Sequence, residues 1–138
     1  MTEPDEVKSC YPDNLSSELW ANGISELYSV PRVSECASQF DLTRGWALDK
    51  LTVDKDGQRW DFDIEKIRDK ARKLLNRTRP KLLVGSPMCT FFSKLMSLNW
   101  GRMDPERAEF EWQRAVSHLL FAIEMYREQM FEWQIVSA

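Results

Sequence analysis

The residues best suited to chemistry lie between Leu82 and Ser93, where a short aliphatic run leads through glycine and proline to a cysteine. An aliphatic run bounded by turn residues predicts a buried strand, as in a parallel sheet. In open parallel sheets, ligands bind at the carboxyl ends of the strands, and Cys89 follows such an end directly. Because a cysteine thiolate is a strong nucleophile, this position makes Cys89 a candidate nucleophile for covalent catalysis.

The segment resembles the catalytic loop of the cytosine-5 DNA methyltransferases, usually written G-x-P-P-C-Q-x-F-S. The matching residues are Gly85, Pro87, Cys89, Phe92 and Ser93. Met88 and Thr90 stand where the family has a second proline and a glutamine. The resemblance implies that Cys89 adds to carbon 6 of a cytosine flipped out of DNA, so that carbon 5 can accept a methyl group.

The same resemblance implies S-adenosylmethionine as cofactor. In the family, the first strand ends in a motif of the type D-x-F-x-G-x-G, whose glycines let the backbone approach the cofactor. The equivalent run here is residues 26–32, in which Val30 and Arg32 stand at the glycine positions. A later acidic residue accepts hydrogen bonds from the ribose, and Asp49 is its counterpart. The implied cofactor-binding residues are Glu26, Tyr28, Ser29, Asp49, Gly85 and Pro87.

The elements that position these residues follow from local patterns. Residues 24–30 alternate apolar and polar side chains, which predicts a strand, and 45–49 form a candidate second strand. Pro31 predicts a helix to about Phe40, and Asp63 is the expected cap of a helix to about Arg77. Asp104 and Pro105 predict the start of a long helix, and residues 131–138 resemble a last strand. The apolar face of the first helix comprises Val33, Cys36, Ala37 and Phe40, and the stripe of the long helix Ala108, Trp112, Ala115, Val116, Leu119, Ile123, Tyr126 and Met130.

Strands that alternate with helices predict an α/β fold with a parallel sheet, and the resemblance implies a Rossmann-like methyltransferase fold. That fold would be incomplete, because only one helix fits between Asp49 and Leu82 and the family's Glu-Asn-Val motif does not follow. We expect a flexible N-terminal arm at residues 1–22 and a truncated methyltransferase-like domain at 23–138. The strand at residues 24–30 should lie beside the Leu82 strand and parallel to it.

The composition of the chain bears on its contact with DNA, its location in the cell and its ability to bind metal. The 138 residues contain 43% apolar residues and carry a formal net charge of −3, so contact with DNA requires a local basic surface such as residues 66–81. The acidic start and the lack of a long apolar run predict an intracellular protein without a membrane partner, nuclear or cytoplasmic. Three widely spaced cysteines and one histidine predict free thiols and no metal site, with His118 solvated or capping.

Two functions stay open from the sequence. The first is an S-adenosylmethionine-dependent cytosine-5 DNA methyltransferase-like domain, degenerate or incomplete, with DNA as its partner. The second is a Rossmann-like module without catalysis that binds nucleic acid or protein, or that is the remnant of a polyprotein. The pattern is also similar to methyltransferase-like segments of mobile-element polyproteins. The order glycine, proline, cysteine at 85–89 favours the first, and the residues at positions 30 and 32 favour the second.

Overall fold

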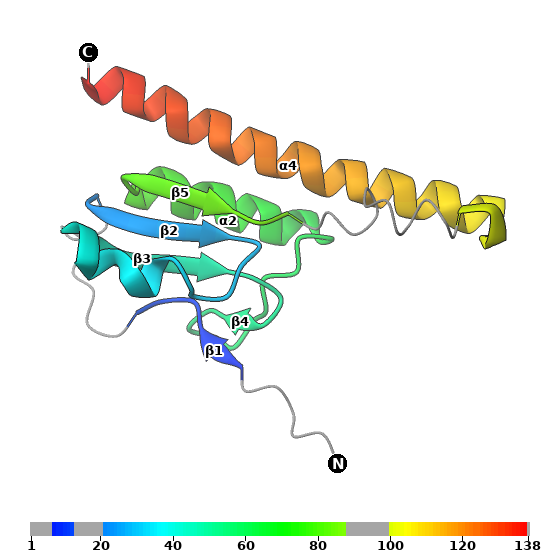
Figure 1. Ribbon diagram of the computed structural model, residues 1–138, viewed down its shortest axis with the longest axis horizontal. Coiled ribbons are helices and arrows are strands. Elements are labelled where there is room, and N and C mark those ends of the chain that lie inside the picture. Colours follow the sequence, from blue (N-terminus) through cyan, green and yellow to red (C-terminus); the bar gives the residue numbers. More distant parts are fainter. Residues whose placement is uncertain (1–6, 13–20, 88–99, 138) are drawn as a thin grey trace.

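A three-stranded parallel sheet forms the centre of this computed structural model, which describes residues 7–12, 21–87 and 100–137. The strands lie in the order β3–β2–β5 (Figure 1). Their bounds are Gly23–Leu27 for β2, Thr43–Leu48 for β3 and Leu82–Gly85 for β5. A separate parallel pair is formed by β1, Lys8–Ser9, and β4, Thr52–Val53. The chain is therefore an α/β protein with small parallel sheets.

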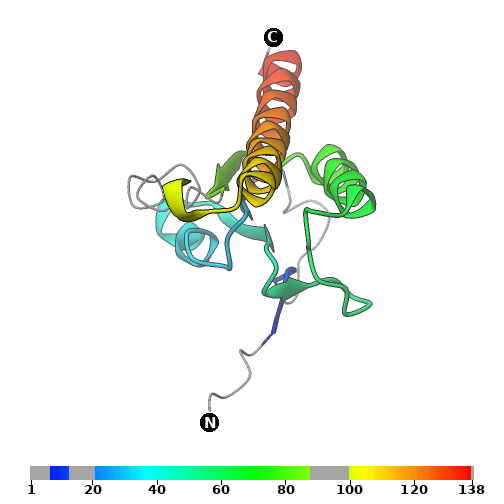
Figure 2. The same ribbon diagram turned by 90° about the vertical axis from the view of Figure 1, so that its right-hand side faces the viewer.

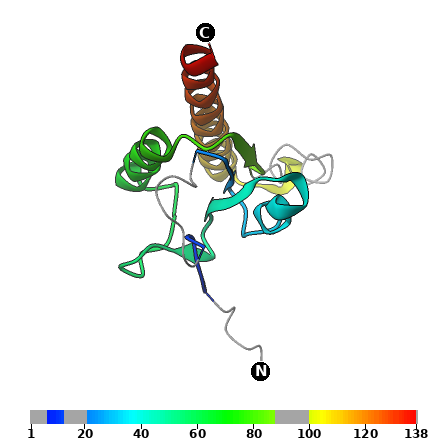
Figure 3. The same cartoon turned by 90° about the vertical axis from the view of Figure 1, so that its left-hand side faces the viewer.

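Helices cover both faces of the sheet. Helices α2, Glu65–Thr78, and α4, Pro105–Ser137, lie on one side. The 3₁₀ helix η1, Ser34–Phe40, lies on the other side, against β2 and β3 (Figures 2 and 3). A second 3₁₀ helix, η3, spans Trp100–Arg102 and precedes α4. The long helix α4 packs against both α2 and β5.

The predicted neighbour relationship of the two key strands is confirmed. Strand β2 pairs in parallel with β5, with Ile24 opposite Leu82 and Leu27 opposite Gly85. A parallel pair needs a long connection between its strands, and this connection contains β3, β4 and α2. The pairing brings the end of β2 next to the start of the segment that leads to Cys89.

The main core lies between the sheet and helices α2 and α4. Trp46, Trp60 and Phe62 are its largest fully buried side chains. The indole Nε1 of Trp46 donates to the Thr78 hydroxyl at 2.9 Å, which joins β3 to the end of α2. Buried side chains of this size stabilise the fold by roughly 1.5–3 kcal/mol each. The remaining members include Leu27, Leu48, Ile67, Ala71, Leu74, Leu75, Leu83, Phe121, Ala122 and Met125.

Helix α2 forms where the sequence predicts it, but without the predicted cap. Its N-cap is Ile64, which makes no side-chain capping bond. Asp63 does not cap the helix, because its carboxylate binds Arg114 and His118 on α4 instead. The helix ends at Thr78, and the C-cap residue Arg79 has a φ of 44°, in the left-handed region. The apolar face of α2 is therefore predictable, whereas the role of Asp63 is not.

Three predicted elements differ from the structure. Strand β2 ends at Leu27 rather than at Val30, because Tyr28 has a φ of 59° and cannot continue an extended strand. The predicted helix before Phe40 is a 3₁₀ helix, and its predicted apolar face is largely exposed, since only Ala37 of that set is buried. The predicted last strand is helical, because α4 continues to Ser137.

The predicted buried stripe of α4 is wrong in its position around the helix. Leu119 is 39% exposed, Ile123 43% and Met130 62%, although all three were expected in the core. The buried positions of α4 are instead His118, Phe121, Ala122 and Met125. Because apolar residues occur on more than one side of this helix, periodicity alone does not identify the side that meets the sheet.

The segment predicted as a flexible N-terminal arm contains packed residues. Lys8 and Ser9 pair with Thr52 and Val53. Cys10 is 1% exposed, accepts a hydrogen bond from the backbone of Ala47 at 2.9 Å and belongs to the core. Residues 8–10 are therefore part of the folded structure, although they lie far in sequence from the central strand.

Candidate functional site

The carboxyl ends of the three central strands share one edge of the sheet. The backbone N–H of Tyr28 donates to the carbonyl of Leu48 at 2.8 Å, and that of Ser86 donates to Leu27 at 3.0 Å. These bonds continue the sheet just past β2 toward both neighbours. The three sequence segments with predicted site residues, 26–29, 49 and 85–87, therefore meet at this edge, while Cys89 lies outside the described residues. Ligands of open parallel sheets bind at such an edge.

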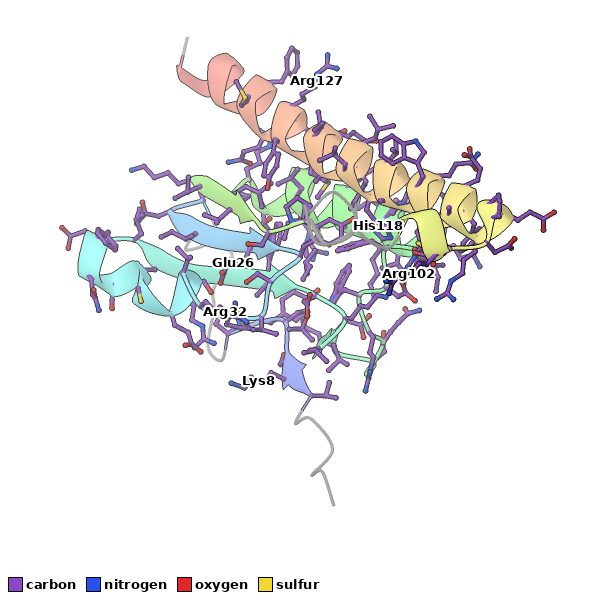
Figure 4. All side chains as sticks on the ribbon, turned by 45° about the vertical axis from the view of Figure 1, so that its right-hand side comes forward. Lys8, Glu26, Arg32, Arg102, His118 and Arg127 are labelled. Atoms are coloured by element: carbon purple, nitrogen blue, oxygen red, sulfur yellow. The ribbon has the colours of Figure 1, made fainter. Side chains whose placement is uncertain are left out.

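Glu26 is bound by the loop that follows its own strand. Its side chain is fully buried, at 1% exposure. The carboxylate accepts hydrogen bonds from the backbone N–H of Arg32 at 2.9 Å, of Val33 at 3.1 Å and of Ser34 at 3.1 Å. It also accepts one from the Ser34 hydroxyl at 2.6 Å. Figure 4 shows Glu26 on β2 and Arg32 in the loop that follows it.

These bonds determine the charge of Glu26. Burial raises the pKa of a carboxyl group, but the Ser34 hydroxyl and three backbone N–H groups stabilise the anion, so the pKa of Glu26 lies below its ordinary value. Ser29 adds to the same loop by donating to the carbonyl of Val30 at 2.8 Å and to Glu26 at 3.3 Å. Glu26 and Ser29, both predicted cofactor contacts, thus organise residues 29–34.

Tyr28, at the carboxyl edge of the sheet, has an unusual backbone conformation. Its φ of 59° is in the left-handed region, which non-glycine residues rarely adopt and which costs on the order of 1 kcal/mol. Its ring packs against Phe62, with 5.0 Å between the ring centroids. Its phenol oxygen lies 2.7 Å from Nδ1 of His118 on α4. The side chain is therefore anchored to a distant helix.

His118 is buried at 3% exposure rather than solvated or capping, so that prediction is wrong. Its Nε2 lies 2.7 Å from Oδ1 of Asp63, and Asp63 accepts two hydrogen bonds of 2.9 Å from Arg114. Figure 4 shows His118 on the side of α4 that is turned toward the sheet. One signal for this burial was present in the sequence, because Phe121, Ala122 and Met125 follow at helical spacing on the same face.

Tyr28, His118, Asp63 and Arg114 form a continuous polar network, which we call the Tyr28–His118 network. The hydrogen bonds from Arg114, with a further contribution from His118, hold the pKa of Asp63 well below its usual range. Nε2 of His118 lies within hydrogen-bond distance of the ionised Asp63, and its Nδ1 lies within hydrogen-bond distance of the Tyr28 phenol. Burial raises the pKa of Tyr28, so its phenol stays protonated and acts as a hydrogen-bond donor. The network thus positions Tyr28 and joins the sheet edge to α2 and α4.

Asp49 and Gly85 lie at the predicted edge in defined surroundings. Oδ2 of Asp49 accepts the backbone N–H of Leu51 at 3.1 Å, as in a turn after a strand. A side chain at Gly85 would collide with the phenol of Tyr126, so this glycine permits α4 to approach the end of β5. Burial raises the pKa of Tyr126. Both predicted residues therefore reach the edge, with Gly85 covered by α4.

The described residues contain neither grouped metal ligands nor a helix that could span a membrane. Within 7–12, 21–87 and 100–137, no three His, Cys, Asp or Glu side chains are grouped as metal ligands. Cys10 and Cys36 are free thiols, and burial raises the pKa of Cys10. None of the helices described has both the length and the apolar character needed to cross a membrane.

Comparisons with known proteins assign no family to this chain. No family model, curated protein or solved structure matches it. The geometry of the carboxyl edge and the motif at residues 85–93 are therefore the observations that bear on its function.

Proposed function

We propose that this chain is a cytosine-5 DNA methyltransferase-like domain of Rossmann-like topology, in a degenerate form. In this proposal S-adenosylmethionine binds at the carboxyl edge of the sheet, and Cys89 stands at the position of the nucleophile. One observation carries most of the support. The parallel pairing of β2 with β5 puts residues 26–29 beside Gly85, Ser86 and Pro87, as the motif at residues 85–93 requires.

Asp49 is the residue that we assign to cofactor recognition. It follows β3 directly, and the bond between Tyr28 N–H and Leu48 carbonyl keeps the ends of β2 and β3 together. A carboxylate at this place can accept hydrogen bonds from two ribose hydroxyls. When bound, S-adenosylmethionine would supply the methyl group, and the residues of this chain would bind and orient it.

The degenerate character follows from the loop after β2. Val30 and Arg32 carry side chains where the family has glycines, and Pro31 offers no backbone donor. The N–H groups of Arg32, Val33 and Ser34 donate to Glu26, so a ligand would have to compete for them. We therefore expect cofactor binding to persist in weakened form and methyl transfer to be lost.

Calorimetric titration with S-adenosylmethionine tests the proposal. We expect one binding site per chain and, in Asp49→Ala, an affinity about ten- to a hundredfold lower, since a charge-assisted hydrogen bond contributes roughly 1.5–3 kcal/mol. Asp56→Ala is the matched control, because Asp56 is an exposed acidic residue in the turn after β4. Absence of binding to the unaltered chain, or equal affinity in Asp49→Ala, would contradict the proposal.

The second candidate is a Rossmann-like module without catalysis that binds nucleic acid. It is favoured by the internal engagement of Glu26 and Ser29 and by the coverage of Gly85. Lys66, Lys73 and Arg77 are exposed and recur along one face of α2, where they could contact phosphates. Fluorescence anisotropy with labelled duplex DNA separates the two candidates. Salt-sensitive binding that Lys66→Glu/Lys73→Glu abolishes, in a chain that ignores S-adenosylmethionine, would establish this alternative.

A further inference from the structure

Helix α4 carries apolar side chains on two opposite faces. One face packs on the sheet through Phe121, Ala122 and Met125. At about 100° per residue, a second set centres on Ile123, roughly opposite to that buried face. We call this set the outer stripe. Its exposed members are Trp112, Leu119, Leu120, Ile123, Met130 and Phe131. A helix that is apolar on both sides is typical of one that lies between two packed layers.

A groove accompanies the outer stripe. It has a volume of about 780 Å³ and lies between α2 and α4, with Leu120, Ile123 and Met130 among its walls. A second hollow of about 420 Å³ continues the groove toward the start of α4, beside Val116 and Leu120. Side chains of a neighbouring helix pack into such grooves when two helices cross at a shallow angle. The surface therefore has the shape that a second helix requires.

We propose that the outer stripe is the docking surface for a second copy of this chain, with the two α4 helices antiparallel. The charges along the stripe select this occupant. Glu109 and Arg127 are 18 residues apart, about five helical turns, so both lie on the same side of α4, within the outer stripe and opposite His118. In an antiparallel pair centred on position 118, Glu109 of each copy lies opposite Arg127 of the other. Figure 4 shows Arg127 directed away from the sheet.

In a dimer with two-fold symmetry, the ion pair between Glu109 and Arg127 forms twice, once on each side of the axis. A parallel pair centred in the same way would place Glu109 beside Glu109 and Arg127 beside Arg127, which disfavours that orientation. An isologous interface also covers the part of the stripe between Glu109 and Arg127 on both copies at once. The charge pattern thus specifies the partner and its direction.

The expected affinity follows from the length of the contact. Residues 109–127 span roughly 27 Å of helix, so the pair forms an interface at the small end of the range for specific complexes, about 1,000 Å² in total. We expect a reversible dimer with a dissociation constant on the order of 1–100 μM. This inference goes beyond the proposed function and does not depend on it.

Sedimentation equilibrium of the full chain under reducing conditions tests the dimer. We expect a monomer–dimer equilibrium that Ile123→Asp shifts toward monomer by about a hundredfold or more, because it places a charge at the centre of the stripe. Phe40→Asp is the control, since Phe40 is an exposed apolar residue on η1, away from α4. Circular dichroism of each variant confirms that it is folded. A chain that stays monomeric up to several hundred μM would overturn the proposal.

Charge reversal tests the antiparallel direction. Glu109→Arg and Arg127→Glu should each weaken the dimer about tenfold, because each creates two like-charge contacts. The combined variant Glu109→Arg/Arg127→Glu should restore the affinity of the unaltered chain. A dimer that ignores the single reversals, or that the double reversal fails to restore, would contradict this arrangement.

Discussion

Nδ1 of His118, in the middle of α4, lies 2.7 Å from the phenol oxygen of Tyr28, which directly follows the central strand. The two residues are 90 positions apart in the chain. Because Tyr28 has a left-handed backbone conformation, the loop at the carboxyl edge begins from a residue that needs support from elsewhere. His118 supplies that support, and Asp63 orients His118 in turn.

Removal of the contact between Tyr28 and His118 should destabilise the fold, and the effects of substituting the two residues should be coupled. We expect His118→Ala to lower the free energy of unfolding by about 2–4 kcal/mol, since it leaves a cavity and buried polar groups without partners. Tyr28→Phe should cost about 1–2 kcal/mol. In urea denaturation, the double variant should lose less than the sum of the two. Gln113→Ala, at an exposed position of the same helix, is the control, and strictly additive losses would contradict the coupling.

The Tyr28–His118 network should also make stability depend on pH through Asp63. The hydrogen bonds from Arg114 lower the pKa of Asp63 in the folded state from its ordinary value of 3.8. A lowered pKa gives stability that is present above the unfolded-state value and is lost as pH falls through the folded-state value. The unaltered chain should therefore exceed Asp63→Asn in stability at pH 7, and the difference should shrink below about pH 3.8.

Urea denaturation at a series of pH values between 7 and 2.5 measures that difference. Asp56→Asn, which alters an exposed turn carboxyl, controls for the change in net charge. A stability difference between the unaltered chain and Asp63→Asn that stays constant over this range would show that Asp63 does not contribute in this way.

Gly45 is required where β3 bulges against β2. Between the pairs Ile24–Arg44 and Glu26–Ala47, β3 contains one residue more than β2. A Cβ at position 45 would lie 2.6 Å from the carbonyl oxygen of Ile24, and the backbone there has little room to move. Gly45→Ala should therefore cost about 2–3 kcal/mol or more, as overpacking does. Gly101→Ala, which meets open space, should leave the thermal unfolding midpoint unchanged or raise it slightly.

Covalent trapping separates resemblance from activity. DNA that contains 5-fluorocytosine traps an active nucleophile of this class, because fluorine blocks the elimination that releases the enzyme. We expect no adduct from this chain in the presence of S-adenosylmethionine, since Val30 and Arg32 alter the cofactor loop and a displacement of about 1 Å can reduce a rate about a hundredfold. An adduct on a denaturing gel that Cys89→Ser abolishes would overturn the degenerate form of the proposal.

Local patterns in the sequence were enough to determine most of the elements near the candidate site. The aliphatic run at Leu82 predicted β5, the apolar spacing from Ile67 to Leu75 predicted the buried face of α2, and Pro105 predicted the start of α4. The pairing of β2 with β5 was expected from the topology that the resemblance implies, together with the preference for right-handed crossovers. These features depend on neighbours a few residues away, or on the limited ways in which parallel strands connect.

Only the tertiary structure decided which groups meet at the carboxyl edge. The apolar residues of α4 occur on more than one side of the helix. Their periodicity therefore identifies a helix but leaves open whether His118 or Ile123 faces the sheet. Likewise, Glu26 could serve a ligand or a loop, and its four hydrogen bonds to residues 32–34 become visible only in the fold. The physical reason is that a side chain's partners are set by packing between distant segments, which local spacing does not encode.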